Sequence, residues 1–341
     1  PTSLRGVTNA FMANAATIRT RLSYAGVDRF HPRPGIAIVA DGDLTLSTDW
    51  NFRAGTAPAF QWRYGATGGT DLGEPGVLTL RAGGNLVLNG SLSDGFTTAT
   101  SAGLLLVGAS GDVPSASKAS WSYRLVSGAD LVAADPLAVR DAAALGDSGH
   151  LLLGANRIVR TGAGDIDIAT GGDLRMAAST SVIYTAGVGN QPGDHAAVGP
   201  ANQFNIAGGF TTARYPMIGG DLRVRVAGDV AGQGGDQWVN NWLYRVGRLD
   251  ENGLLETAAT PSAMRRPAWW PQFSAFRGGI AALGGGDVTI EAGGSIRDLG
   301  VASATNGRLP GEDGAAPDAA NLKVQGGGDV VVRAGRGIGS A

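Results

Sequence analysis

The chain has 341 residues, of which 56 are glycine and 16% are charged, while hydrophobic residues make up 43%. Small residues and aliphatics with few charges favour stacked β structure over a helical bundle or a disordered chain. The net charge of −2 argues against a nucleic-acid partner, and the absence of cysteine excludes disulfides and thiolate metal sites.

The N-terminal segment, 1–32, carries a single helical pattern. Apolar residues recur at helical spacing from Phe11 to Leu22, and Thr8 stands where it can cap a short helix. The sequence begins at Pro1 and shows no signal-peptide pattern, so we expect it to be a section of a longer protein.

A phrase of glycine, aspartate or asparagine and alternating aliphatics then occurs six times. The first aliphatic of each copy has an apolar residue two positions on and another eight positions on. The two-residue step is the periodicity of a strand, and the eight-residue step spans one short strand and a tight corner. The six first aliphatics are Leu44, Leu78, Ile166, Leu222, Val288 and Val330.

This pattern predicts which side chains face the interior. We expect each first aliphatic and the residue two positions on to be buried, while residues between them, such as Thr79, Arg223 and Thr289, face solvent. The glycine pairs supply the backbone freedom that a corner needs. The aspartate or asparagine that follows is expected to bond its own neighbouring backbone amides.

A strand–corner–strand unit cannot bury its inner face alone, but a stack of units can. Helical patterns for βαβ crossovers are scarce between the copies. The sequence therefore predicts an all-β fold, a parallel β-helix (solenoid) with inserted loops and short helices. The copies start 34 to 88 residues apart, which indicates degenerate coils and inserted loops. The coils are expected over 33–232 and 285–341.

Residues 233–284 interrupt the coils with an aromatic-rich insertion. Trp238 and Trp242 are expected to share one face of a short helix capped by Asp236, and an extended segment should follow near Pro271. The aromatics either contact a partner or cover an apolar flank of the coils, and burial is the more common fate of large aromatics. The candidate partner-contact residues are Trp238, Trp242, Trp269, Trp270, Phe273 and Phe276.

The repeat phrases, taken in order, resemble filamentous haemagglutinin-type exoproteins, the large secreted partners of bacterial two-partner secretion systems. The phrases that carry the resemblance include RPGIAIVADGDLTLSTDWNF (33–52), TGAGDIDIATGGDLRMAASTSVIYTAG (161–187), SAFRGGIAALGGGDVTIEAGGSIRD (274–298) and GGGDVVVRAGRGIG (326–339). The resemblance implies a right-handed β-helical rod, passage through an outer-membrane β-barrel secretion partner, and a secreted location at the bacterial cell surface.

Together these features predict a cell-surface or filament protein, an adhesin or structural rod without catalysis. Its partner would be a host-cell or bacterial surface receptor or glycan. Two alternatives stay open. One is an architectural sheath or filament subunit that self-associates by stacking end to end, and the other is a β-helical polysaccharide-degrading enzyme.

No catalytic residue, cofactor or metal site is predicted. Turn formation explains the six aspartates that precede strands, and the three histidines lie far apart without metal-ligand spacing. The tandem nine-residue units of a calcium β-roll are absent. The aspartates are Asp43, Asp165, Asp173, Asp221, Asp287 and Asp329, and the histidines are His31, His150 and His195.

Overall fold

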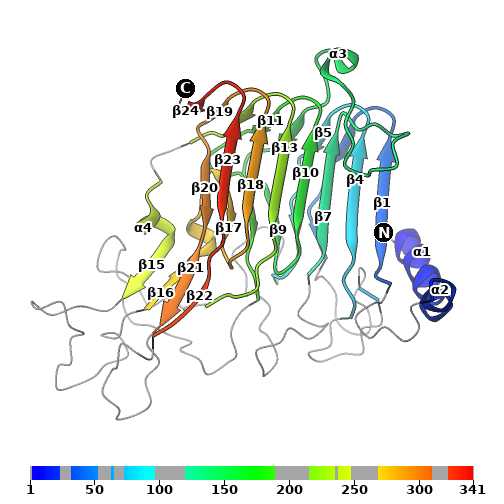
Figure 1. Ribbon diagram of the computed structural model, residues 1–341, viewed down its shortest axis with the longest axis horizontal. Coiled ribbons are helices and arrows are strands. Elements are labelled where there is room, and N and C mark those ends of the chain that lie inside the picture. The colour runs from blue at the N-terminus through cyan, green and yellow to red at the C-terminus, as the bar shows by residue number, and fades with distance from the viewer. Residues whose placement is uncertain are drawn as a thin grey trace, which may run out of the picture.

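The chain folds mostly into β structure. Three long parallel sheets stand together, and a smaller antiparallel sheet lies beside their C-terminal end (Figure 1). This computed structural model describes residues 2–23, 32–52, 63–64, 73–96, 120–188, 215–234, 237–246, 268–308 and 322–340. None of the helices in these ranges is long and apolar enough to cross a membrane.

The three parallel sheets are visited in turn, so that each circuit of the chain adds one strand to each sheet, except that the last described circuit adds none to the third sheet. We call one such circuit a rung. Sheet A contains β1 (Gly35–Ala40), β4 (Val77–Ala82), β7 (Ser122–Ser127), β10 (Ile166–Thr170), β13 (Leu222–Val226), β18 (Val288–Ala292) and β23 (Val330–Ala334). Sheet B contains β2 (Leu44–Leu46), β5 (Leu86–Leu88), β8 (Leu151–Leu153), β11 (Leu174–Met176), β14 (Val230–Ala231), β19 (Ile296–Arg297) and β24 (Ile338–Gly339). Sheet C contains β3 (Trp50–Asn51), β6 (Leu92–Ser93), β9 (Ile158–Thr161), β12 (Val182–Thr185), β17 (Gly279–Ala282) and β20 (Gly300–Ser303).

The eight-residue step of the sequence is the step from sheet A to sheet B. Ile166 lies in β10 and Leu174, eight residues later, lies in β11. Ile166 pairs with Leu222 of the next rung, and Leu222 pairs with Val288. Equivalent residues of successive copies are therefore stacked in register, as the periodicity predicts.

Two parts of the repeat alignment were wrong. The alignment treated Leu44 as equivalent to Leu78, but Leu44 lies in sheet B, where it pairs with Leu86. The residue that pairs with Leu78 in sheet A is Ile36, so the first copy was aligned one strand too late. The longest gap between copies also hides a rung, whose sheet A strand is β7 with Tyr123 at the inward position. Tyr123 escaped the pattern because it is aromatic, and the sheet B strand of its rung does not begin eight residues later, at Leu131, but at Leu151, after an excursion.

The interior of the rungs is one continuous apolar core built from all three sheets. Leu78, Leu86 and Leu92, one from each sheet of the same rung, are fully buried. Apolar area removed from water stabilises by roughly 25 cal/mol per Å², so this column of aliphatics is the main source of stability. The predicted burial is wrong at Val330, which is 44% exposed because no described rung covers it, and at Thr79, which was expected to be exposed and is buried. Leu44 and Val332, in the first and last rungs, are only partly buried, and Thr289 is intermediate and not fully exposed.

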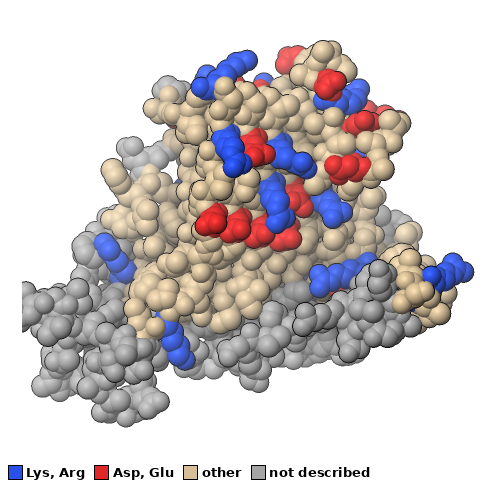
Figure 2. Space-filling model, in the orientation of Figure 1, with Lys and Arg blue, Asp and Glu red and all other residues tan. Residues whose placement is uncertain are grey.

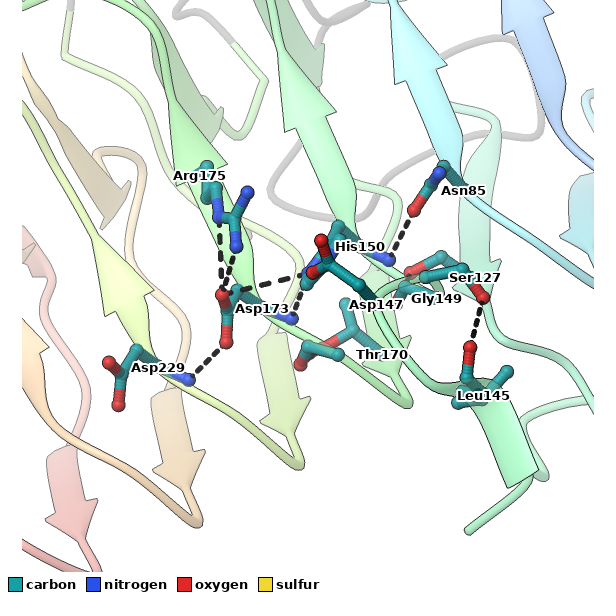
Figure 3. Close-up of polar contacts among 12 residues, drawn as sticks. Asn85, Ser127, Leu145, Asp147, Gly149, His150, Thr170, Asp173, Arg175 and Asp229 are labelled. Atoms are coloured by element: carbon teal, nitrogen blue, oxygen red, sulfur yellow. Dashed lines mark hydrogen bonds and ion pairs between the residues drawn. The ribbon is translucent and has the colours of Figure 1, made fainter. Parts of the chain in front are cut away.

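The corner residues form ladders that run from rung to rung. Asp173 Oδ1 accepts a hydrogen bond of 2.7 Å from the Asp229 backbone N–H (Figure 3). Asp229 Oδ1 in turn accepts one of 2.7 Å from the Ser295 N–H. A second ladder at the entry to sheet A links Asp165, Asp221, Asp287 and Asp329 in the same way. The expectation that these carboxylates bond their own neighbouring amides was therefore wrong: they bond the equivalent amide of the next rung.

His150 takes the place of an aspartate in the first ladder. Its Nδ1 accepts the Asp173 N–H at 2.8 Å, while its own backbone N–H donates to Asn85 Oδ1 at 2.9 Å (Figure 3). Because Nδ1 is the acceptor, the proton of the neutral ring is on Nε2, which lies 3.4 Å from Asp147. His150 is a structural residue of a corner, and His31 and His195 lie outside the described residues.

The N-terminal segment forms two helices rather than one. Helix α1 spans Thr2–Met12 and α2 spans Ala15–Arg21, beside the first rung in Figure 1. Thr8 is inside α1, so its predicted role as a cap was wrong. A further short helix, α3 (Ala142–Leu145), belongs to an excursion between β7 and β8.

Excursions from the last rungs build the antiparallel sheet. Between β14 and β17 the chain forms α4 (Val239–Trp242), β15 (Leu243–Val246), β16 (Ala268–Pro271) and a 3₁₀ turn at Phe273–Ala275. Between β20 and β23 it forms β21 (Thr305–Arg308) and β22 (Lys323–Gly326). The four strands pair in the order β15-β16-β21-β22, so two successive excursions join into one sheet.

Candidate functional site: an aromatic-lined cleft

The antiparallel sheet separates the two neighbouring tryptophans of β16. Arg245 of β15 stands opposite Trp269, and Tyr244 stands opposite Trp270. Residues that oppose each other in an antiparallel pair share a face, and successive residues of a strand point to opposite faces. Trp269 and Arg245 therefore share one face, and Trp270 and Tyr244 the other.

The inner face of this sheet is an aromatic cluster. Trp270 is fully buried and meets Tyr244 and Tyr215 edge to face, at ring-centroid distances of 6.2 and 6.3 Å. Edge-to-face pairs are favourable because the positive edge of one ring meets the negative face of the other. Trp270 is a structural anchor and not a partner contact.

The other buried aromatics of the insertion cover the outer face of sheet C. Phe273 stacks on Tyr184 of β12 at 6.0 Å with nearly parallel rings, and Trp242 meets Phe276 edge to face at 5.5 Å. All three insertion residues lie in one cluster with the outward side chains of sheet C. The insertion thus folds back against one flank of the stack, and Trp242, Phe273 and Phe276 are not available to a partner.

Trp238 was wrongly expected to share a helical face with Trp242. Helix α4 has only four residues and begins after Trp238, whose backbone is extended. The indole of Trp238 is 72% exposed, whereas Trp242 is buried. Asp236, the predicted cap, lies outside the described residues.

Trp238 and Trp269 line a cleft of about 590 Å³ on the outer side of the antiparallel sheet. Its walls are otherwise formed by Val239, Asn240, Leu243, Arg245 and Ala268. Ligand sites in proteins are commonly hollows of this size with apolar walls and a few polar groups. Of the six aromatics singled out in the sequence, Trp238 and Trp269 line this cleft, and the other four belong to the buried clusters.

The position of Trp269 is fixed by β21. Its indole Nε1 donates to Thr305 Oγ1 at 3.3 Å, and the six-membered part of the ring lies against Gly307. A Cβ atom at position 307 would overlap the indole, so the absence of a side chain there allows the ring to lie flat. Sequence reasoning identified Trp269 but not Gly307, because the two meet only through the pairing of separate excursions.

The polar groups of the cleft are an amide and a guanidinium. Asn240 is half-buried, and its Oδ1 is buried without a hydrogen-bond partner among the described residues. Arg245 is exposed at the rim. No aspartate or glutamate of the described chain is among the lining residues.

The outer face of sheet A has a different character. Positive and negative side chains are interspersed over it (Figure 2), and they pair across neighbouring strands, as in Arg333–Glu291 at 2.7 Å and Arg223–Asp167 at 3.7 Å. Exposed pairs of this kind contribute little to stability. Because the opposite charges on this face pair with each other, the face has no patch of a single charge that could bind a charged polymer.

No group of three or more potential metal ligands is present in the described parts of the chain. Comparisons with protein-family models, with curated proteins and with solved structures find no match.

Proposed function

We propose that this chain is a section of a secreted bacterial surface protein of the filamentous haemagglutinin type, folded as a right-handed parallel β-helix and acting as an adhesive rod without catalysis. The observation that carries the proposal is the in-register stacking of seven strands in each of sheets A and B. A stack of this kind grows by adding rungs and keeps its long sides available for contacts.

The proposed right-handedness of the coil follows from the twist of its strands. Each rung connects parallel strands of one sheet by a crossover through the other two, as from β10 to β13. Crossovers between parallel strands are right-handed in nearly all proteins because of the twist of L-amino-acid strands.

The absence of catalysis is part of the proposal. Most glycoside hydrolases use two carboxylates that converge on a groove. The corner carboxylates are instead occupied by backbone N–H groups, as in the Asp173–Asp229 bond. Asp94, the most deeply buried carboxylate of the described residues, is enclosed and paired with Arg63 at 2.6 Å.

The alternative is an end-to-end filament. Val330 and Ile338 of the last described rung are exposed, and a strand edge of this kind is a template for further pairing, by a following rung of the same protein or by a second copy. Asp329, which continues the sheet A ladder, can accept a backbone N–H from a rung added there. A second copy that adds in this way would make the rod a filament subunit.

The proposed location and export route can be tested in the source bacterium. An epitope inserted at Val132, which is 95% exposed in a turn, should leave the stack intact. We expect antibody to label intact cells, and labelling should disappear when the gene of the outer-membrane β-barrel partner is deleted. A tag that becomes accessible only after lysis would disprove the surface location.

Electron microscopy of the purified chain distinguishes the two forms of the proposal. Isolated short rods support the adhesin, whereas long filaments that disappear in an Ile338→Lys variant support end-to-end stacking.

A further inference from the structure

The corner between sheets A and B contains a ladder in which one member changes its charge near neutral pH. In successive rungs a side chain accepts a hydrogen bond from the backbone N–H of the equivalent residue in the next rung. Carboxylates and amides keep their acceptor oxygens between about pH 5 and 8, whereas an ordinary imidazole is protonated within this range. In rung order the acceptors are Asp43, Asn85, His150, Asp173 and Asp229, so the ladder has one imidazole among the described rungs.

The Nδ1 atom of His150 can accept a hydrogen bond only while the ring is neutral. It accepts the Asp173 backbone N–H at 2.8 Å (Figure 3). In a protonated imidazole both nitrogens carry hydrogen, and neither can act as an acceptor. Protonation of His150 would therefore place two N–H groups against each other at this distance, and the bond to the next rung would be lost.

Two carboxylates are placed to accept hydrogen bonds from the protonated ring. Asp173 Oδ2 lies 3.6 Å from Nδ1, and Asp147 Oδ1 lies 3.4 Å from Nε2 (Figure 3). The cation of this corner is Arg175 of β11, which donates to Asp173 Oδ2 at 2.6 Å. On the side of the preceding rung, the uncharged amide of Asn85 bonds the His150 backbone. The corner thus offers the protonated ring new partners in exchange for the one that it loses.

A change at His150 acts on the segments on both sides of it. His150 follows directly on Gly149, whose carbonyl oxygen accepts the Gly172 N–H at 2.9 Å and ends the excursion between β7 and β8. On the other side, Asp173 binds the next rung through Oδ1, which accepts the Asp229 N–H. A carboxylate that moves toward the protonated ring therefore also alters its bonds to Arg175 and to the next rung.

We propose that His150 is a pH-sensitive joint of this ladder. With the neutral ring, Nδ1 accepts the Asp173 N–H and joins the two rungs. With the protonated ring, this bond is replaced by ion pairs from Nδ1 to Asp173 and from Nε2 to Asp147, and the Asp173 N–H opens to water. The joint is a property of the corner and does not depend on the proposed adhesive function.

Hydrogen exchange at the Asp173 amide, resolved by NMR, measures the state of the joint. The unaltered chain and a His150→Asn variant are compared at the same pH, so that the intrinsic pH dependence of exchange cancels in the ratio of their rates. Asparagine is the matched replacement because Asn85 is the acceptor in the preceding rung. We expect the ratio to be constant near pH 8 and to rise about tenfold in favour of the unaltered chain toward about pH 5, as loss of one hydrogen bond implies.

The Ser295 amide is the internal control, because its acceptor in the same ladder is the carboxylate of Asp229. Its exchange ratio should stay constant over this range. If His150→Asn does not fold, Ser295 loses protection in the variant as well. The Asp173 amide is then compared with the Ser295 amide within the unaltered chain, and the same tenfold rise is expected.

Nitrogen NMR of histidine-labelled protein tests the proton positions without a change at the corner. The chain has three histidines, and a His31→Gln/His195→Gln variant retains only His150. We expect Nδ1 to carry no hydrogen in the neutral ring, and protonation of the ring to have the same midpoint as the rise in exchange. An exchange ratio that stays constant down to about pH 5, a hydrogen on Nδ1 of the neutral ring, or two different midpoints would overturn the inference.

Discussion

The stacked rungs and the antiparallel sheet beside them are built from the same chain by different rules. In the stack, each inward position repeats its surroundings from rung to rung, as where Ile166, Leu222 and Val288 follow one another in sheet A. In the antiparallel sheet each aromatic has different neighbours. The adjacent residues Trp269 and Trp270 lie on opposite faces, and Trp270 is fully buried while Trp269 lines the cleft. Repetition makes burial predictable, and its loss makes burial depend on partners far away in the sequence.

The largest expected effect tests the aromatic sheet. Trp270→Ala should lower the free energy of unfolding by about 3–5 kcal/mol, because it removes a fully buried indole and leaves a cavity. Trp238→Ala in the same excursion should change it by less than about 0.5 kcal/mol. Urea unfolding of both variants measures the difference, and equal losses would contradict the assignment of the two tryptophans to opposite environments.

The next effect tests the stack itself with two residues at the same position of neighbouring rungs. Ile296 is 2% exposed and Ile338, its sheet B partner, is 63% exposed. Ile296→Ala should cost about 2–4 kcal/mol of unfolding free energy, and Ile338→Ala less than about 1 kcal/mol. If the second loss matched the first, the last rung would be covered, for example by another copy, and the loss at Ile338 should then depend on protein concentration.

A smaller effect tests the corners. Gly286 has a φ of +113°, and a Cβ there would lie 2.5 Å from the Gly220 carbonyl oxygen, whereas Gly42 has open space around it. Gly286→Ala should therefore destabilise by about 1–3 kcal/mol, while Gly42→Ala should be neutral or slightly stabilising. Thermal melts of the two variants provide the comparison, and a neutral Gly286→Ala would show that this corner is not constrained.

The ladder bonds should contribute less. Asp229→Ala removes the acceptor of the Ser295 N–H and should cost about 1 kcal/mol of unfolding free energy. Asp229→Asn keeps an acceptor oxygen, as Asn85 does in the same ladder, and should retain most of the stability. Urea unfolding of the two variants measures the difference. Equal losses would mean that the negative charge of Asp229, and not its hydrogen bond, stabilises the fold.

The smallest effect depends on pH. Burial raises the pKa of Asp173, but the Asp229 N–H and Arg175 outweigh it and hold this pKa below its usual value. The carboxylate therefore contributes stability above the unfolded-state pKa of about 3.9, and this contribution is lost as the pH falls through the lower folded-state value. The stability difference between the unaltered chain and Asp173→Asn should be constant near neutral pH and shrink below about pH 4. A difference that stays constant in acid would disprove the assignment.

Part of the fold was accessible from the sequence because strand periodicity acts locally. The alternation in Leu222–Val226 and the glycine–aspartate corners predicted strands, corners and their stacking. The rung of Tyr123 and the displaced first copy were missed because pairing partners, and not the motif, define equivalence between rungs. The corner aspartates were recognised as turn residues, but their acceptor role reaches across rungs and is absent from any single copy.

The candidate site was less predictable. The sequence pointed to six aromatics without separating exposed from buried ones. Which aromatics are exposed and which are buried depends on the alternation of faces along β16, on the packing of Phe273 against Tyr184 of sheet C, and on the lack of a side chain at Gly307. These contacts join segments that are tens of residues apart and follow no common period.

The sequence by itself determined that the chain is β-rich, that its aliphatics alternate and that its corners are built from glycine and aspartate, because these properties depend on neighbouring residues and on the two-residue period of a strand. Only the tertiary structure decided which rungs are equivalent, which carboxylate binds which amide, and which tryptophans line the cleft. These outcomes depend on the register between rungs and on the pairing of two separate excursions, and both are set by contacts between residues far apart in the chain.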